Sequence, residues 1–281
     1  MRIAVIGASG FIGRHLRAAL RERGDTIVTA TLRMPEAAAR SCDGADAVVN
    51  LAGEDIAHRW TRKLKAAIWT SRVDAPHAMI EHFGSLAAPP KAYISASAVG
   101  YYGTSESATF TEKSPPGRDF LAGVCAAWES TADEAARFGA RVTKVRTGLA
   151  LGPDGGALSR LLPIFRIGGG GVIASGRQWH SWIHIDDIVG IYLSAIDGVE
   201  GVLNATAPNP IHNAEFVQAL SRVLNRPAVV PVPELALRLM LGDGAMVLTE
   251  GQRVLPERTL ATGYAYKHTT IDEALRALLS S

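Results

Sequence analysis

The chain has 281 residues, a net charge of +2 and two cysteines, with 47% hydrophobic and 20% charged residues. This length and composition predict a compact globular protein and argue against a disordered chain. The small net charge, without a dense run of Lys or Arg, predicts no nucleic-acid partner. Two cysteines cannot build a disulfide framework, and no stretch approaches the roughly 18 to 20 apolar residues of a membrane span, so we expect a cytoplasmic protein without a membrane partner.

Apolar runs alternate with helical patterns along the first half of the chain. The runs are Arg2–Ile6, Thr26–Leu32, Ala47–Leu51, Ala92–Ser97 and Arg141–Val145, and the helical patterns are Phe11–Arg23, Lys63–Phe83 and Phe120–Phe138. Strands that alternate with helices predict βαβ units and a parallel sheet. The predicted fold class is therefore α/β, with a Rossmann-type doubly wound parallel sheet.

The pattern changes after Gly152, where glycine-rich and proline-rich connections separate the predicted elements. Helices are expected near Asn213–Leu224 and Glu234–Leu241, without regular strand spacing between them. We expect a nucleotide-binding domain of residues 1–151 with parts of 181–206, and a smaller C-terminal α/β substrate lobe of residues 152–180 and 207–281.

The stretch VIGASGFIGR at Val5–Arg14 places three glycines three residues apart, between the first strand and the first helix. The unpaired N–H groups and partial positive charge of a helix N-terminus can hold a pyrophosphate. Gly7 permits the tight turn, Gly10 lets the nucleotide approach the backbone, and Gly13 lets the helix pack close to the strand. The spacing is G-x-x-G-x-x-G, not G-x-G-x-x-G, and a glycine turn without a ligand is the alternative. The position in a βαβ unit favours a dinucleotide site.

The end of the second strand indicates which dinucleotide is bound. NAD proteins usually carry an acidic residue there for the ribose 2′-hydroxyl, whereas NADP proteins carry an arginine. The segment TATLRMP contains Arg33 and no acidic residue, and Asp25 would lie at the opposite end of the strand. The sequence therefore predicts NADP(H), with a solvated surface arginine as the alternative.

Several motifs together resemble one protein family. They are the glycine turn, DAVVNLAGE at Asp46–Glu54, YISASAVGYYG at Tyr93–Gly103, SWIHIDD at Ser181–Asp187, RW at Arg59–Trp60, SR at Ser71–Arg72, WE at Trp128–Glu129, APNP at Ala207–Pro210 and ATGYAY at Ala261–Tyr266. Over nearly its whole length the chain resembles the atypical extended short-chain dehydrogenase/reductases called epimerase family proteins. The resemblance implies an NADP-dependent oxidoreductase or a nucleoside-diphosphate-sugar epimerase.

The resemblance also implies a cofactor site whose residues follow successive strands. The pyrophosphate turn would contain Gly7, Ser9, Gly10, Phe11, Ile12 and Gly13, the ribose phosphate would meet Leu32 and Arg33, and Leu51, Ala52, Gly53 and Arg72 would lie beside the nucleotide. Ser97 matches the catalytic Ser or Thr of the superfamily at the end of the fourth strand.

The Tyr-x-x-x-Lys pair of active superfamily members is missing. If Glu129 is the glutamate that commonly follows the lysine by four residues, the lysine position beside the cofactor is Cys125 and the tyrosine position is Leu121. Because leucine cannot donate a proton, the proton donor is expected to be Tyr101 or Tyr102, with simple packing as their alternative role. Cys125 could react only with a lowered pKa, and inert burial is the alternative.

Five further positions carry polar side chains whose roles the sequence leaves open. His184 falls in a strand pattern and is interpreted as structural, whereas His180 is expected in a loop where a substrate could meet it. Asp186 and Asp187 indicate a helix N-cap and first turn more than an acid–base pair. Arg146 could equally meet a substrate phosphate or pair with a carboxylate. No Cys/His pair has zinc-ligand spacing, so no metal is expected.

Two functions of different classes remain. The first is an NADP(H)-dependent oxidoreductase or epimerase with a rearranged proton donor, acting on a carbonyl compound, an alcohol or a nucleotide sugar. The second is an NADP(H)-binding regulatory or redox-sensor protein without turnover. A second lobe with aromatic and glycine-rich loops near the expected cofactor end favours the enzyme. The expected partner is a small-molecule substrate, and a homodimer is left open.

Overall fold

The structure is a computed structural model that describes residues 1–279. Its centre is a six-stranded sheet of order β10-β6-β4-β3-β1-β2. The strands are β1 (Arg2–Ile6), β2 (Thr26–Ala30), β3 (Ala47–Asn50), β4 (Ala92–Ala98), β6 (Arg141–Thr147) and β10 (Gly201–Ala205). Every neighbouring pair is parallel, and the strand order reverses between β1 and β3. The predicted α/β fold with a Rossmann-type sheet is confirmed, with β2 ending two residues earlier than expected.

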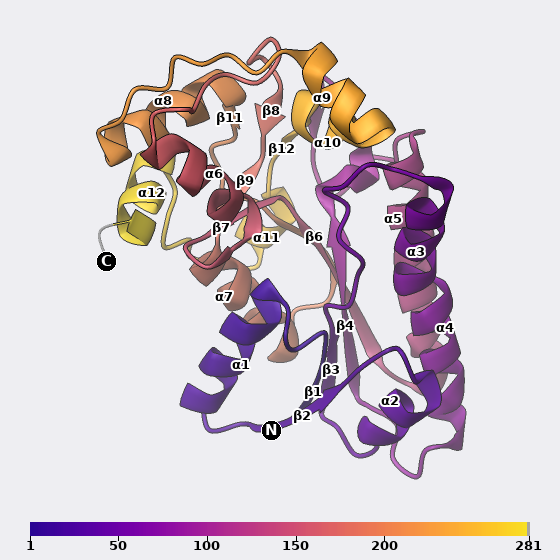
Figure 1. Cartoon of the computed structure of the whole chain (residues 1–281). Coiled ribbons are helices and arrows are strands. Elements are labelled where there is room, and N and C mark those ends of the chain that lie inside the picture. Colours follow the sequence, from indigo (N-terminus) through magenta and orange to yellow (C-terminus); the bar gives the residue numbers. More distant parts are fainter. Residues whose placement is uncertain (280–281) are drawn as a thin grey trace.

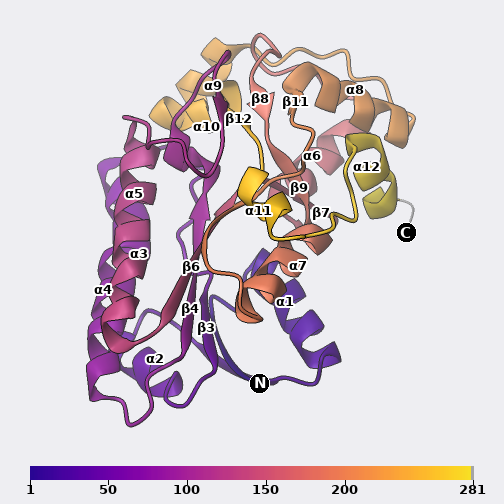
Figure 2. The same ribbon diagram turned by 180° about the vertical axis from the view of Figure 1, so that it is seen from behind.

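Helices cover both faces of this sheet, as Figures 1 and 2 show. One face carries α1 (Phe11–Glu22) and α7 (Ile185–Ile196), and the other carries α2 (Pro35–Ser41), α3 (Arg62–Arg72), α4 (Asp74–Glu81) and α5 (Phe120–Asp133). The strands are buried on both sides: Ile3 and Val5 face one core, and Ala4 and Ile6 face the other. This alternation is the two-residue period of a strand, and it explains why β1 is apolar throughout.

The expected single helix over Lys63–Phe83 is two helices with a break at Val73. Val73 has φ −113° and ψ −65°, and Pro76 follows in the first turn of α4. A proline ring clashes with the carbonyl four residues before it and offers no N–H, so one continuous helix cannot pass this point. The chain then ends the segment with a 3-10 turn at His82–Ser85.

The remaining elements form the upper part of the molecule in Figure 1. They are β5 (Thr109–Phe110), β7 (Leu149–Gly152), α6 (Gly156–Arg166), β8 (Trp179–His180), β9 (Trp182–His184), β11 (Ile211–His212), α8 (Asn213–Leu224), α9 (Glu234–Leu241), α10 (Met246–Thr249), β12 (Arg253–Val254), α11 (Glu257–Ala261) and α12 (Ile271–Leu279). Helices α8 and α9 have the predicted bounds. The chain leaves the sheet after β6 and returns to it in β10, while the proposed division into two domains stays a prediction. Among the described residues, no helix has the length and apolarity needed to cross a bilayer.

Asp186 and Asp187 lie in the first turn of α7, as expected, but neither of them is the N-cap. The cap is His184, whose Nδ1 accepts the N–H of Asp186 at 3.0 Å. Asp187 is fully buried, and its carboxylate accepts the N–H groups of Lys267 and His268 at 2.8 and 3.1 Å. Asp187 therefore ties the segment before α12 to α7, rather than capping the helix.

We expect Gly→Ala substitutions at Gly13 and Gly123 to change the free energy of unfolding in opposite directions. A Cβ at Gly13 would lie 2.4 Å from the Gly7 carbonyl oxygen, whereas a Cβ at Gly123, exposed in α5, would meet nothing within 4 Å. Gly13→Ala should lower the free energy of unfolding by about 1–3 kcal/mol through overpacking. Gly123→Ala should raise it by about 1 kcal/mol, since alanine favours a helix interior. Urea unfolding measures both, and equal effects would contradict the tight helix–strand packing at Gly13.

Candidate functional site

Most of the predicted site residues lie at one edge of the sheet. They are the turn Gly7–Gly13 after β1, Leu32 and Arg33 after β2, Leu51–Gly53 after β3, Ser97–Tyr102 at the end of β4, and Arg146 in β6. Because all six strands are parallel, their carboxyl ends meet at the same edge. Ligands of open α/β sheets bind outside this edge, where the strand order reverses.

The glycine turn leaves the start of α1 open to an anion. Gly7 has φ +75°, and a Cβ there would lie 2.8 Å from the carbonyl carbon of Leu51, so the turn itself requires glycine. A Cβ at Gly10 would meet only the Gly7 oxygen, at 3.2 Å, so protein packing constrains Gly10 less. Gly10 is also the N-cap of α1, without a side-chain cap, and the first turn contains no acidic residue. Its N–H groups are thus available to a phosphate.

The glycine-rich segment at the end of β7 packs on this turn. A Cβ at Gly152 would lie 2.4 Å from the Phe11 ring, and a Cβ at Gly155 would lie 2.3 Å from it. These glycines therefore make room for the first side chain of α1. The sequence contained both features, but nothing in their spacing indicated that they meet.

Two arginines at this edge have no carboxylate partner among residues 1–279. The Arg33 side chain is exposed, and its residue bonds only through its backbone N–H to Thr31. The half-buried guanidinium of Arg72 donates to the Glu54 carbonyl at 2.9 Å and lies 5.2 Å from the Trp128 ring centroid. Burial lowers the pKa of Arg72. The Glu54 and Asp55 carboxylates attract Arg72 from a distance, but neither forms an ion pair with it, so its guanidinium could still meet an anionic or polar ligand.

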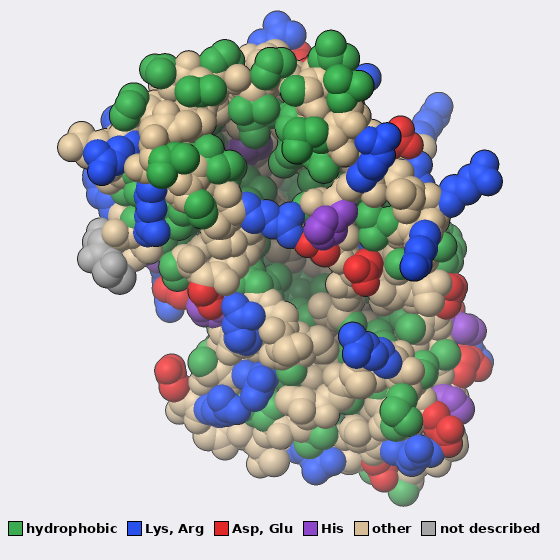
Figure 3. Space-filling model, viewed as in Figure 1, with side chains coloured by type: hydrophobic (Ala, Val, Ile, Leu, Met, Phe, Trp, Pro, Cys, Tyr) green, Lys and Arg blue, Asp and Glu red, His purple; other side chains and the backbone are tan. Residues whose placement is uncertain are grey.

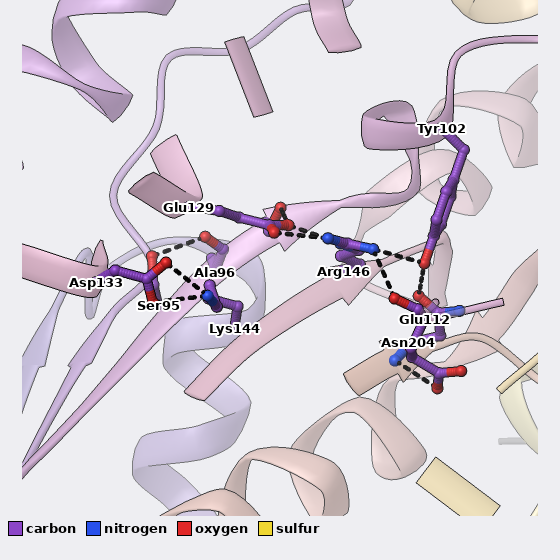
Figure 4. Close-up of polar contacts among 10 residues, drawn as sticks. Ser95, Ala96, Tyr102, Glu112, Glu129, Asp133, Lys144, Arg146 and Asn204 are labelled. Carbon is purple, nitrogen blue, oxygen red and sulfur yellow. Dashed lines mark hydrogen bonds and ion pairs between the residues drawn. The ribbon is translucent and has the colours of Figure 1, made fainter. Parts of the chain in front are cut away.

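A buried ion pair links the ends of β4 and β6 to α5, as Figure 4 shows in part. Glu129 accepts from Nε and Nη2 of Arg146, each at 2.7 Å, and the two side chains are 7% and 3% exposed. The Ser97 hydroxyl donates to Oε1 of Glu129 at 2.7 Å. Of the two roles that the sequence left open for Arg146, the structure has the pairing with a carboxylate.

The two neighbouring tyrosines differ in what their hydroxyl groups do. The Tyr102 hydroxyl accepts from Nη1 of Arg146 at 2.9 Å and donates to Oδ1 of Asn204 at 2.6 Å. Tyr102 is 3% exposed, and burial raises its pKa to about 12. The ring of Tyr101 lies 3.4 Å from the Arg146 guanidinium carbon. Within residues 1–279 the hydroxyl of Tyr101 has no hydrogen-bond partner, so it alone of the two has an uncommitted proton.

The expected tyrosine and lysine positions face the segment after β4. A Cβ at Gly100 would lie 3.6 Å from Cβ of Leu121 and 3.9 Å from Sγ of Cys125. Cys125 is 4% exposed, and burial, with the neighbouring Glu129 charge, raises its pKa to about 12. Its thiol is protonated near neutral pH, in agreement with the inert alternative.

Two histidines of the upper part are neutral near pH 7, because burial lowers the pKa of His180 and of His184 to about 4. His180 lies in β8, paired with β11, and not in the expected loop. It packs edge-on against Phe216, with ring centroids 5.4 Å apart. His184 is 4% exposed and caps α7, which agrees with a structural role.

The Glu129–Arg146 pair predicts a large loss of stability when one charge is removed. Glu129→Gln leaves the Arg146 guanidinium buried without a counter-charge, so we expect the free energy of unfolding to fall by about 3–5 kcal/mol. Asp133→Asn is the matched control, one turn later on α5, because its pair with Lys144 is 56% exposed at the carboxylate. That change should cost less than about 1 kcal/mol. Similar losses for both variants in urea unfolding would argue against a buried, paired Glu129.

Comparisons with known proteins agree with this geometry. The model of the NAD dependent epimerase/dehydratase family matches residues 3–206, and a model described as a domain of unknown function matches residues 232–278. The "Epimerase family protein SDR39U1 homolog, chloroplastic" of Arabidopsis thaliana is 41% identical, over 99% of this chain and 87% of that protein.

Two solved structures extend the likeness to three dimensions. The human epimerase family protein SDR39U1 (isoform2), solved with NADPH, has a TM-score of 0.93 and 36% identity over 100% of both chains. The nucleoside-diphosphate sugar epimerase of Corynebacterium glutamicum has a TM-score of 0.79 and 31% identity, over 99% of this chain and 58% of that one. Family model, sequence and fold thus agree that the chain belongs to the NAD dependent epimerase/dehydratase family, among the atypical extended short-chain dehydrogenase/reductases.

Proposed function

We propose that the protein is an NADP(H)-dependent oxidoreductase or epimerase that binds its dinucleotide across the carboxyl edge of the sheet. The observation that carries the proposal is the uncapped N-terminus of α1 behind Gly10, which offers free N–H groups to a pyrophosphate. The edge lies at the strand reversal between β1 and β3, where dinucleotides bind in this class of sheet. The human relative solved with NADPH supports the same cofactor.

Arg33 is the residue that we assign to the choice of NADP(H). Its exposed guanidinium follows β2 and has no partner among the described residues. A planar guanidinium forms two charge-assisted hydrogen bonds to a phosphate, whereas the ribose hydroxyl of NAD offers no such charge. Leu32, which is 8% exposed, would hold the segment beside the adenosine.

Arg72 is assigned to the nicotinamide half of the cofactor. Its guanidinium lies over Gly53, where a Cβ would come within 2.9 Å of Nη2, and its electrostatic neighbours are the lysine position Cys125 and the carboxylates of Glu54 and Asp55. In active members of the family a lysine at the position of Cys125, on α5, places a positive charge beside the cofactor. We propose that Arg72, on α3, provides this charge here. The cofactor would then require no ionisable side chain at positions 121 and 125.

The proton donor that the geometry favours is Tyr101. A hydroxyl has one proton, and those of Ser97 and Tyr102 are already donated to Glu129 and Asn204. Ser97 can still accept a hydrogen bond from a substrate hydroxyl, so we assign it a positioning role. Bound NADPH would supply a hydride to the carbonyl carbon of a small-molecule substrate, while Tyr101 would give its proton to the carbonyl oxygen.

The cofactor assignment predicts a selective loss in Arg33→Ala. Without the guanidinium, the affinity for NADPH should fall about 10- to 100-fold, which is the loss of a hydrogen bond to a charged group, with little change for NADH. Nicotinamide fluorescence titration measures both affinities. Arg21→Ala, at the far end of α1, is the matched control and should change neither. Equal losses for the two cofactors would remove Arg33 from the 2′-phosphate site.

The turnover assignment predicts different outcomes for the two tyrosines. Tyr101→Phe should lower turnover by roughly 10²- to 10⁴-fold without changing NADPH affinity, as expected for the loss of a general acid. Tyr102→Phe should instead lower the free energy of unfolding by about 1–3 kcal/mol, because it leaves Asn204 without its donor. The assay follows NADPH oxidation over a panel of carbonyl compounds and nucleotide sugars. NADPH binding without turnover of any of them would favour a binding protein over an enzyme.

A further inference from the structure

Helix α1 carries three arginines, and two of them have no acidic partner among residues 1–279. Arg14 pairs with Asp154, whose carboxylate lies 3.1 Å from Nη2 of the arginine. Arg17 and Arg21 form no ion pair within the described residues. Figure 3 shows Lys and Arg side chains over the part of the molecule that α1 forms. This positive charge lies on the helix that follows the glycine turn, where it favours an anion.

The Arg17 side chain leans back along α1 to the glycine turn. Helical side chains tilt toward the N-terminus of their helix, so a side chain at this position points toward the turn that precedes α1. Its Nη1 donates to the Ala8 carbonyl at 3.4 Å, which is a long hydrogen bond. Its Nε is buried and has no hydrogen-bond partner among the described residues, and Nη2 has no acceptor there either. The guanidinium is therefore held at the turn with most of its N–H groups unused.

The turn that Arg17 contacts lies next to the segment that holds Arg33. Strands β1 and β2 are parallel neighbours, and their last residues, Ile6 and Ala30, are register partners. Because neighbouring strands lie about 4.8 Å apart, the turn after β1 and the segment after β2 leave the sheet at adjacent positions. An arginine side chain is longer than this spacing. Arg17 and Arg33 can therefore reach one group that is bound between them.

A groove between α1 and β2 runs from the start of β2 toward the same point. Its volume is about 360 Å³, and it is lined by Arg17, Arg21, Asp25, Ile27 and Thr29. At one end the Asp25 carboxylate is already paired, with Arg23 at 2.6 Å and with the N-terminal amine at 2.8 Å. At the other end Thr29 lies one residue before the end of β2, and the Arg17 charge is unpaired. The unbalanced positive charge of the groove thus lies toward the carboxyl edge of the sheet.

One arginine does not balance the charge of a phosphate monoester. Such a phosphate carries about −1.5 to −2 near neutral pH, whereas a guanidinium carries one positive charge. Arg33 alone would therefore leave part of a ribose 2′-phosphate unneutralised. Arg14 does not complete the balance, because Asp154 pairs with it and with His15. Arg17 is the arginine of α1 that combines an unpaired charge with contact to the glycine turn.

We propose that Arg17 is a second residue that selects NADP(H), and that it binds the 2′-phosphate from α1 while Arg33 binds it from the segment after β2. The inference rests on the proposed function for the place of the dinucleotide. Two guanidinium groups on opposite sides of one phosphate form charge-assisted hydrogen bonds that a ribose hydroxyl cannot replace. The preference for NADPH over NADH is therefore shared between a helix and a loop.

The test compares adenosine 2′,5′-bisphosphate with 5′-AMP, which lacks only the 2′-phosphate, so it does not depend on turnover. Arg17→Met removes the charge and keeps an unbranched apolar stem. Calorimetry should show bisphosphate binding weakened about tenfold or more, as for a lost hydrogen bond to a charged group, with 5′-AMP binding unchanged. Arg17→Lys should retain part of the preference. Arg21→Met, one helical turn further from the glycine turn, is the matched control and should leave both affinities as they are.

A purely structural role of Arg17 gives a different result. Arg17→Met removes a buried N–H without an acceptor, so its midpoint of urea unfolding should not fall. A lower midpoint with equal weakening of both probes would mean that Arg17 only supports the turn, and the inference would fail.

The remaining outcomes separate the inference from the proposed function. The double variant Arg17→Met with Arg33→Ala should bind the two probes alike, because neither guanidinium remains for the 2′-phosphate. If Arg17→Met keeps the full preference for the bisphosphate, Arg17 has no part in the choice and Arg33 alone makes it. An unmodified protein that binds both probes equally would contradict the NADP(H) choice in the proposed function, and the inference would fail with it.

Discussion

The buried ion pair between Glu129 and Arg146 is the interaction on which the candidate site depends. Burying two charges costs several kcal/mol per ion unless good geometry and further hydrogen bonds compensate, and here every nitrogen of the guanidinium has an acceptor. Through these bonds the pair holds β4, β6 and α5 in one arrangement and fixes both tyrosines beside it. Glu129 also accepts the hydroxyl proton of Ser97, whereas Tyr102 accepts from Arg146 and donates its own proton to Asn204. The contacts that stabilise this edge therefore leave neither hydroxyl with a proton for a substrate.

The charged side chains at the carboxyl edge of the sheet are paired on one side and lack an ion pair on the other. On the side of β4 and β6, the arginine is matched by a carboxylate, and the hydroxyls of Ser97 and Tyr102 donate to groups within the protein. On the side of β1, β2 and β3, Arg33 and Arg72 lack a carboxylate partner among the described residues, and the first turn of α1 is uncapped. An anionic cofactor would complete the second half and leave the first unchanged. We propose that this division would let the edge bind a dinucleotide even with Leu121 and Cys125 at the expected tyrosine and lysine positions.

Local patterns predicted the sheet and most helices, because a strand or an amphipathic helix repeats its apolar residues at short, fixed intervals. The break at Val73 also had a local signal in Pro76, which the single expected helix overlooked. The contacts that define the site have no such signal. Glu129 and Arg146 lie on different elements, and Phe11 meets the glycines at the end of β7 only once the chain has folded. Which hydroxyl keeps a free proton depends on these long-range partners, so sequence alone left Tyr101 and Tyr102 equivalent.

The late return of β10 to the sheet has a consequence for synthesis on the ribosome. Residues 148–200 must be translated between β6 and β10, which takes several seconds at ~5–20 residues per second. During that interval one edge of β6 has no neighbour, and an unpaired strand edge is a template for pairing with another chain. Asn204, the acceptor for Tyr102, arrives with β10. Nascent chains that have completed β6 but not β10 therefore expose an unpaired strand edge, and the contact between Tyr102 and Asn204 cannot form before β10 has been made.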